Sequence, residues 1–127
     1  MRLLVALDMK GRTVAVVGAG RVGMRKARKM AACGARLRII DPAASEWAGH
    51  DVCARVFEPG DLDGCDLAIA CTGVESVDQK VAEEARERGI WCNLAVGGGD
   101  IDLVATYRHG AVAIGVHPTG HGLQRRR

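Results

Sequence analysis

Aromatic side chains are scarce in this chain, and several other features are missing altogether. Phenylalanine, tyrosine and tryptophan make up 3% of the 127 residues. Sites for nucleic acid combine basic stripes with interleaved aromatic residues, so this composition disfavours nucleic acid as a partner. Every apolar run is far shorter than the roughly 18 residues that a membrane span requires, which disfavours a membrane protein. The sequence also shows no internal repeat and no low-complexity segment.

Cysteine is present, but not in a pattern typical of a disulfide framework or a metal site. The five cysteines form an odd set without a C-x-x-C pair, and several lie in apolar runs. A thiol in such a run acts as a small hydrophobic side chain. We therefore expect reduced cysteines in or near the core and no metal site, with a disulfide or metal ligand as the alternative. The apolar residues 3–7 are followed by Asp8 and are too short for a secretory signal, so we expect a cytoplasmic protein.

The length of the chain predicts one domain with little left over for a separate substrate domain. The net charge of +3 equals the charge of the three arginines at residues 125–127, so the rest of the chain is close to neutral. We expect a nucleotide-binding domain over residues 1–120 and a basic, disordered tail over residues 121–127.

The most informative segment follows the apolar run at residues 14–17. It reads Gly-Ala-Gly-Arg-Val-Gly and leads into a helical pattern over residues 24–33. A dinucleotide pyrophosphate needs close backbone approach and unpaired N–H groups, and a glycine turn before a helix supplies both. Gly18 permits the sharp turn, Gly20 removes a Cβ that would meet the phosphates, and Gly23 permits close packing of helix on strand. The alternative is that the glycines only close a tight strand-to-helix turn.

An acidic residue, Asp41, stands at the end of the second apolar run, residues 37–40. In dinucleotide-binding folds a carboxylate at this place accepts hydrogen bonds from a ribose 2′-hydroxyl. The same charge repels a 2′-phosphate. The sequence therefore predicts NAD, rather than NADP, as the cofactor.

Apolar runs alternate with helical patterns along the chain. The predicted strands cover residues 3–7, 13–17, 37–40, 52–57, 67–70 and 90–94. A weak helical turn is predicted around Trp47, and a helix capped by Ser76 is predicted to run to Arg88. This alternation is typical of an α/β, Rossmann-like, doubly wound and mostly parallel sheet. The ligand crevice of such a sheet lies at the carboxyl ends of its strands.

The pattern changes after the three glycines at residues 97–99. Residues 101–108 and 111–116 predict an antiparallel strand pair attached to the edge of the sheet. Apolar strand pairs seldom stay exposed, so we expect this pair to be covered by a second subunit in a homodimer.

Four segments together resemble one family, and two of them are much more specific than the glycine motif. The four are Leu-Asp-Met-Lys-Gly-Arg at residues 7–12, the glycine motif with Arg-Lys-Ala-Arg at residues 25–28, Asp-Leu-Asp-Gly-Cys-Asp-Leu at residues 61–67, and Ala-Cys-Thr-Gly at residues 70–73. With them the chain resembles the N-terminal domain of siroheme synthase and the stand-alone precorrin-2 dehydrogenases. The resemblance extends over residues 3–120.

This resemblance implies an enzyme in which NAD⁺ accepts a hydride from precorrin-2 to give sirohydrochlorin, on the route to siroheme. Some relatives also insert Fe²⁺, an activity that we expect less of this chain. Carried over by position, the cofactor contacts are Gly18, Gly20, Arg21, Val22, Gly23, Asp41, Pro42, Ala43 and Thr72. The tetrapyrrole substrate bears many carboxylates, so Arg21, Arg25 and Arg108 are chemically sensible partners for it. For the cations of residues 21–29, a solvated outer face is the alternative.

The chain departs from the family at the residue that handles protons. Family members carry an aspartate shortly after the asparagine equivalent to Asn93, and this chain has Val96 there. Asp100 or Asp102 could reach the same space if the glycine loop folds back. His117 has a suitable intrinsic pKa, with a surface loop histidine as the alternative. Two other functions stay open: a nucleotide-binding or regulatory domain without catalysis, and an oxidoreductase that acts on another substrate.

Overall fold

The computed structural model describes residues 1–118. The predicted tail at residues 121–127 and the predicted domain boundary at residue 120 lie outside the described residues. The chain forms two compact units. One consists of residues 8–102, and the other combines residues 1–7 with the segment that starts at Leu103. Each unit contains its own sheet.

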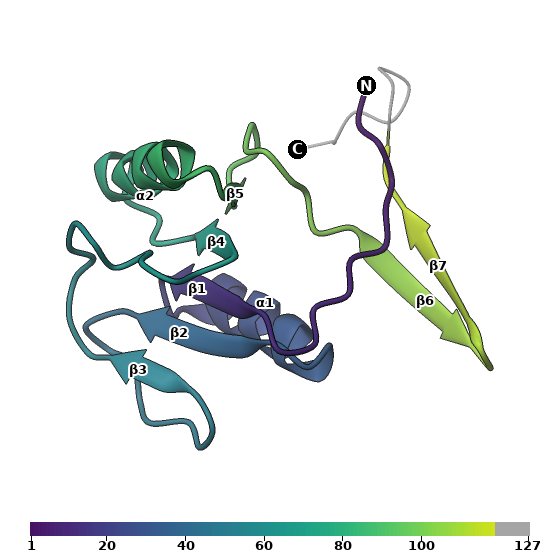
Figure 1. The fold of residues 1–127 in the computed structure, drawn as a ribbon, viewed down its shortest axis with the longest axis horizontal. Helices are drawn as coiled ribbons and strands as arrows, with labels where there is room; N and C mark the ends of the chain where they lie inside the picture. The colour runs from purple at the N-terminus through teal and green to yellow at the C-terminus, as the bar shows by residue number, and fades with distance from the viewer. Residues whose placement is uncertain (119–127) are drawn as a thin grey trace. The chain divides into compact units, whose positions relative to one another are not determined.

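The larger unit confirms the predicted α/β fold (Figure 1). Its elements are β1 (Thr13–Val17), α1 (Arg21–Ala32), β2 (Arg36–Ile40), β3 (Asp51–Cys53), β4 (Leu67–Ala70), α2 (Glu75–Arg88) and β5 (Trp91–Leu94). All five strands are parallel, in the order β3-β2-β1-β4-β5. The chain leaves β1 toward β2 on one side and later returns to β4 on the other. This reversal is the switch point at which such sheets bind ligands.

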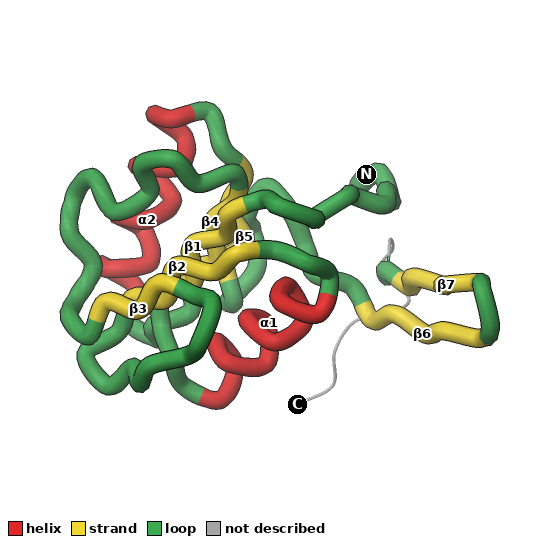
Figure 2. The backbone as a smooth tube through the Cα atoms, turned by 60° about the horizontal axis from the view of Figure 1, so that its bottom comes forward, coloured by secondary structure: helices red, strands yellow, loops and turns green. Residues whose placement is uncertain are grey.

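The two helices cover opposite faces of this sheet (Figure 2). Successive strand residues point to opposite faces, and both faces of β1 are buried because Val14, Ala15 and Val16 are each 0% exposed. On one face, Ala15 and its neighbours form a core cluster with Val81 and Ala85 of α2. A continuous apolar strand covered on both sides is the arrangement that the sequence of residues 13–17 predicts.

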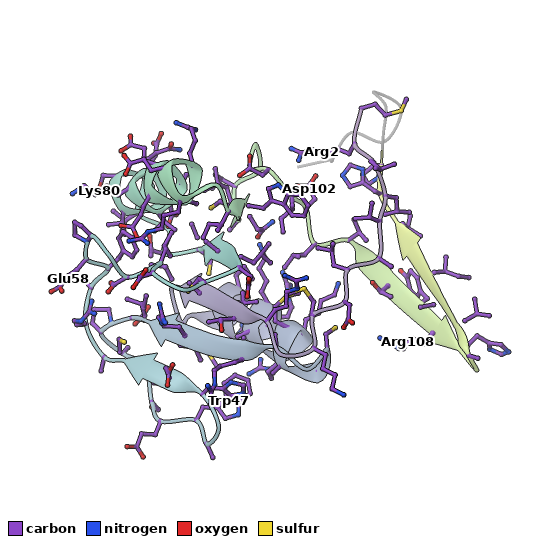
Figure 3. All side chains as sticks on the ribbon, in the orientation of Figure 1. Arg2, Trp47, Glu58, Lys80, Asp102 and Arg108 are labelled. Carbon is purple, nitrogen blue, oxygen red and sulfur yellow. The ribbon has the colours of Figure 1, made fainter. Side chains whose placement is uncertain are left out.

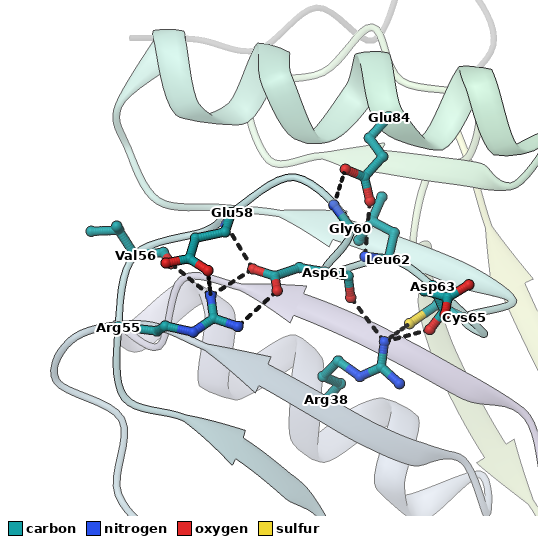
Figure 4. A network of polar contacts seen from close by, with 10 residues as sticks. All are labelled: Arg38, Arg55, Val56, Glu58, Gly60, Asp61, Leu62, Asp63, Cys65 and Glu84. Carbon is teal, nitrogen blue, oxygen red and sulfur yellow. Dashed lines mark hydrogen bonds and ion pairs between the residues drawn. The ribbon is translucent and has the colours of Figure 1, made fainter.

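The loop between β3 and β4 takes the place of a covering helix, and a polar network holds it (Figure 4). Arg38 of β2 donates to the carbonyl oxygens of Asp61 and Asp63 at 2.8 and 2.6 Å. The carboxylate of Glu84 accepts from the amides of Gly60 and Leu62 at 2.8 and 2.9 Å. Leu62 is thereby fixed in the core, where it is 0% exposed. The Asp-Leu-Asp-Gly element is therefore a structural element of the fold.

Asp61 is expected to make the stability of this unit depend on pH. Both oxygens of its carboxylate accept from Arg55 at 2.8 Å, and this pairing holds the pKa of Asp61 below its ordinary value of 3.8. Because the folded-state pKa is the lower one, the stabilisation is present above about pH 4 and is lost as the pH falls through the folded-state pKa. Asp61→Asn should lower the thermal midpoint at neutral pH by a few degrees.

The difference between the wild-type chain and Asp61→Asn should narrow as the pH falls below about 4. Glu87→Gln removes an exposed carboxylate of α2 and provides the matched control. Thermal unfolding followed by circular dichroism at several pH values measures both variants. A constant gap between wild type and Asp61→Asn across the acid range would contradict this role of Asp61.

The smaller unit contains a hairpin of β6 (Ala105–His109) and β7 (Val112–Val116), which confirms the predicted antiparallel pair. The prediction that this pair is attached to the edge of the parallel sheet is wrong, because among the described strands β6 and β7 pair only with each other and form a separate sheet. The register pairs Tyr107 with Ile114 and His109 with Val112, so these side chains share one face. Tyr107 and Ile114 are 63% and 55% exposed. The hairpin thus carries an open apolar face among the described residues.

Four local predictions are wrong. Residues 3–7 form no strand, because they pair with no other described strand. The third strand ends at Cys53, since the chain turns away there to bring Arg55 to Asp61. Residues 43–50 form turns rather than a helical turn, with the Trp47 ring edge-on to His50. Ser76 does not cap α2, because the helix already begins at Glu75.

Within residues 1–118, no helix is both long enough and apolar enough to cross a membrane.

Candidate dinucleotide-binding site

The loop between β1 and α1 is built on three glycines, of which two are required by the fold. Gly18 has φ +112°, and a Cβ there would lie 2.5 Å from the carbonyl oxygen of Cys71. A Cβ at Gly23 would overlap the carbonyl oxygen of Gly18. These two glycines let the loop, α1 and the end of β4 pack closely. Close packing of the turn therefore accounts for glycine at positions 18 and 23, but it does not account for Gly20.

Gly20 faces open space. A Cβ at this position would have no protein atom within 4 Å, and its φ of −75° is accessible to any residue. The absence of a side chain here is thus not required for packing. It keeps clear the space in front of the amino terminus of α1, which is where a bound phosphate would lie.

The amino terminus of α1 offers backbone N–H groups to this space. The first N–H groups of a helix lack an intrahelical acceptor, and no side chain in the described part of the chain caps this helix at Gly20. The first turn contains no acidic residue, and both Arg21 and Val22 are exposed. The helix dipole and Arg21 together favour an anion at this position.

Asp41 lies directly beside the glycine loop. Its carboxylate accepts from the amide of Ala19 at 2.8 Å and from the amide of Ala43 at 2.7 Å. A carboxylate has about four lone-pair sites, so these two bonds anchor the group and leave capacity for ligand hydroxyls. The predicted residues Gly18, Gly20, Asp41 and Ala43 are therefore brought together around one turn.

A cavity of about 230 Å³ adjoins Asp41. It lies between the glycine loop, the end of β2 and the segment after it, and its lining includes Trp47, whose side chain is labelled in Figure 3. The lining residues are Ala19, Met24, Ile39, Ala43, Ala44, Ser45, Glu46 and Trp47. Met24, Ile39 and Trp47 give this cavity an apolar side near Asp41, which suits an adenine base. The sequence does not predict a role for Trp47 and Met24 here, because their contribution depends on the loop path after Pro42.

Thr72 lies at the end of β4 and is held by α2. Its amide and its hydroxyl both donate to one oxygen of Asp78, at 3.0 and 2.8 Å. Asp78 is 5% exposed, so these bonds satisfy a buried carboxylate. Thr72 therefore fixes the turn after β4, and its position at the crevice follows from that turn.

The three predicted proton acceptors, Asp100, Asp102 and His117, lie in different parts of the structure. The loop that contains the three glycines at residues 97–99 does fold back onto β5. The amide of Asp100 donates to the carbonyl oxygen of Cys92 at 2.8 Å, and the amide of Cys92 donates to the carboxylate of Asp100 at 3.0 Å. Asp100 thus covers the open edge of β5. Asp102 lies where its charge acts on Lys26 of α1. His117 belongs to the smaller unit, and Val96 is 83% exposed.

The cysteines of the larger unit range from buried to exposed, and the prediction of a place in or near the core is wrong for Cys33, which is exposed after the end of α1. Cys65 and Cys92 are buried, and Cys71 is partly buried beneath the glycine loop, with its Sγ 3.5 Å from the carbonyl oxygen of Gly18. Burial raises the pKa of both Cys71 and Cys92 to about 11, so these thiols are neutral and poorly reactive near pH 7. No group of three or more potential metal ligands occurs among residues 1–118.

Fold and site together define a class: an α/β domain of the Rossmann type with a glycine-loop site for a nicotinamide dinucleotide. The chain belongs to the family NAD_binding_7, described as "Putative NAD(P)-binding", whose model matches residues 5–104. The resemblance to the siroheme synthase and precorrin-2 dehydrogenase family is confirmed by the relatives below.

Siroheme synthases are similar to this chain over about seven tenths of its length. The siroheme synthase of Azotobacter vinelandii is 40% identical over 94 residues, which are 68% of this chain and 20% of that protein. The siroheme synthase of Citrobacter koseri is 38% identical over 99 residues, which are 72% and 22% of the two chains. This chain thus spans about a fifth of these relatives.

A solved structure shows the same fold over almost the whole chain. "SirC, precorrin-2 dehydrogenase" superposes with a TM-score of 0.79 at 23% identity, over 97% of this chain and 64% of that one.

Proposed function

We propose that this chain is an NAD-dependent dehydrogenase that oxidises precorrin-2 to sirohydrochlorin in siroheme biosynthesis. The observation that carries the proposal is the open space at Gly20 in front of the uncapped helix α1, beside Asp41. The substrate comes from the similarity to siroheme synthases and to a precorrin-2 dehydrogenase. The proposal includes a cytoplasmic location, as the sequence predicts.

The residues present fit NAD. In this proposal the N–H groups at the start of α1, together with Gly18, Gly20, Arg21 and Gly23, hold the pyrophosphate. Asp41 binds the adenosine ribose. The segment with Val22, Pro42 and Ala43 borders the adenosine, and Thr72 borders the nicotinamide half. When bound, NAD⁺ supplies the hydride acceptor. Asp100, Asp102 and His117 are the candidates for proton acceptor that the sequence suggests, and Lys26 is a further candidate.

The direct test is NADH formation from NAD⁺ and precorrin-2, followed by its near-ultraviolet absorbance. We expect turnover that requires both compounds. NAD⁺ binding without turnover would remove the enzyme proposal and keep the binding site.

That second outcome defines the second candidate function, a nucleotide-binding or regulatory domain without catalysis. It is favoured by Val96, an exposed side chain that cannot carry a proton at the position where the family resemblance places an aspartate. Tetrapyrrole oxidation and simple NAD binding would use the same dinucleotide-binding site, so only a measurement of turnover distinguishes the two functions.

Asp41 is expected to set the choice of cofactor. Removing its carboxylate in Asp41→Ala takes away the acceptor for a ribose hydroxyl and also the repulsion of a 2′-phosphate. Hydrogen bonds to a charged group contribute about 1.5–3 kcal/mol, so NAD⁺ affinity should fall by roughly ten-fold or more. NADP⁺ affinity should fall less or rise. Calorimetric titration with both cofactors measures the ratio, and an equal loss for both would show that the carboxylate does not face the ribose.

The homodimer is proposed through the apolar face of the β6–β7 hairpin. Tyr107, Val112, Ile114 and Val116 are each more than half exposed, and an open apolar strand pair of this kind is a pairing surface. Ile114→Lys should convert the dimer to a monomer without unfolding the chain. Light scattering coupled to size-exclusion chromatography measures the mass, with Lys80→Glu on α2 as the surface control. A wild-type monomer, or a dimeric Ile114→Lys variant, would contradict this interface.

A further inference from the structure

Lys26 brings a cation to the carboxyl ends of β4 and β5, although it belongs to α1. Its Nζ donates to Oδ1 of Asn93 at 2.7 Å. Asn93 is the third residue of β5 and is 3% exposed. The amide nitrogen of Asn93 donates in turn to the carbonyl oxygen of Ile101 at 3.0 Å. One side-chain amide therefore joins helix α1, strand β5 and the loop that folds back after the three glycines.

The surroundings of Lys26 favour its neutral form. Burial lowers the pKa of Lys26, and the neighbouring charge of Arg25 lowers it further. Asp102, the last residue of the larger unit, raises the pKa of Lys26, as does Cys71 at the end of β4. Cys71 is itself a neutral thiol near pH 7, because burial raises its pKa to about 11. Asp102 is thus the carboxylate that stabilises the protonated amine.

The partner of Lys26 is also unusual for a lysine that serves only the fold. Asn93 is a neutral amide, so the bond at 2.7 Å orients the amine without fixing its charge. A protonated ε-amino group has three N–H donors, and Asn93 accepts from one of them. The group therefore retains further capacity for a ligand. Burial lowers the pKa of Lys26 from its ordinary value, and a buried lysine with a lowered pKa can serve as a general base.

The proposed reaction needs a base at this end of the sheet. Hydride transfer breaks a C–H bond of the tetrapyrrole and moves its electron pair to the nicotinamide. A second hydrogen leaves the substrate as a proton, and the electron pair of that bond stays to form the new double bond. Val96 cannot accept this proton. Asn93, which holds Lys26, lies three positions before Val96 and pairs in register with Ile69 of β4.

Resting on the proposed function, we propose that the ε-amino group of Lys26 accepts the proton that precorrin-2 loses, with Asn93 as its positioning residue and Asp102 as the counter-charge of the ammonium ion. The amine becomes an ammonium ion and then returns the proton to water, so the net reaction yields NADH and one proton.

Lys26→Arg separates a base from a cation. Arginine keeps the positive charge and the hydrogen-bond donors, but it does not lose its proton in proteins. We expect Lys26→Arg to reduce kcat by roughly 100-fold or more, the range of general base catalysis. NAD⁺ affinity and the thermal midpoint should stay close to those of the wild-type chain. Arg28→Lys, an exchange on the exposed side of the same helix, is the matched control.

The pH dependence gives a second readout. Turnover that requires the neutral amine rises as the pH increases through the pKa of Lys26. Because Asp102 raises that pKa, Asp102→Asn should move the rising limb of the kcat profile to lower pH. A limb that stays in place or moves to higher pH would overturn the role of Asp102.

A third readout does not depend on activity. The ¹³Cε resonance of Lys26 is assigned by its loss in Lys26→Arg. Its titration midpoint should lie at a lower pH than the midpoints of the other lysines. Titration at the ordinary lysine value, or a Lys26→Arg variant with wild-type kcat, would overturn the proposal for Lys26 alone. Absence of turnover in the wild-type chain would instead overturn the proposed function, and this proposal with it.

Discussion

Replacing Gly23 with alanine is expected to unfold the larger unit at a much lower temperature and to abolish cofactor binding. A Cβ at this position would overlap the carbonyl oxygen of Gly18 and would lie 3.0 Å from the Sγ of Cys71. Overpacking a close contact costs about 1–3 kcal/mol and more where the neighbour cannot move. Here the neighbour is backbone with φ +112° at Gly18, so the loop itself must be displaced. Urea or thermal denaturation measures the loss.

The double variant Gly23→Ala with Cys71→Ala identifies the contact that matters. Removing the thiol relieves the contact at 3.0 Å but leaves the overlap with the Gly18 carbonyl oxygen. We expect no rescue of stability. Arg28→Ala introduces an alanine at an exposed position of α1 and serves as the control. It should change the denaturation midpoint little. A Gly23→Ala variant as stable as the wild-type chain would show that the loop does not pack as described.

Replacing Gly20 with alanine is expected to have the reverse profile: an intact fold and a lost cofactor. The added methyl meets no protein atom within 4 Å, and the φ of −75° is ordinary for alanine. At a helix N-cap, alanine is less favourable than glycine by about 1 kcal/mol at most. The methyl does occupy the space in front of the N–H groups of α1. We therefore expect NAD⁺ affinity to fall by roughly 100-fold, a loss of about 2.7 kcal/mol.

Gly20→Ser sharpens this test. Serine is a preferred N-cap residue, so its hydroxyl should keep or raise the thermal midpoint while its Cβ still blocks the phosphates. Calorimetry measures the affinity, and the fluorescence of Trp47, which lines the adjoining cavity, gives an independent signal. Full NAD⁺ affinity in both Gly20 variants would show that the pyrophosphate does not lie against this loop.

The sequence predicts the parts of this protein that depend on local chain properties. The buried run at residues 13–17, the glycine turn and the helix after it are specified by residue types that tolerate few other conformations. The hairpin at residues 105–116 is likewise predicted by its apolar alternation. The position of Asp41 beside the loop follows from parallel pairing of β1 with β2, in which Val17 stands opposite Ile40.

The parts that the sequence does not predict depend on contacts between distant segments. Residues 54–57 alternate like a strand, but Arg55 turns toward Asp61 and ends the pairing. The partner of Lys26 lies 67 positions away at Asn93. In the helical pattern Lys26 is one of several cations on α1, and no local signal separates it from the exposed ones. Only the hydrogen bond from Lys26 to Asn93 of β5 reveals it.

The central claim is that a nicotinamide dinucleotide binds in front of α1 with its pyrophosphate against Gly20. Calorimetric titration of the wild-type chain with NAD⁺ tests it most directly. The account predicts saturable binding of one NAD⁺ per chain. Absence of saturable binding by a folded wild-type chain, with NAD⁺ and with NADP⁺ alike, would contradict it.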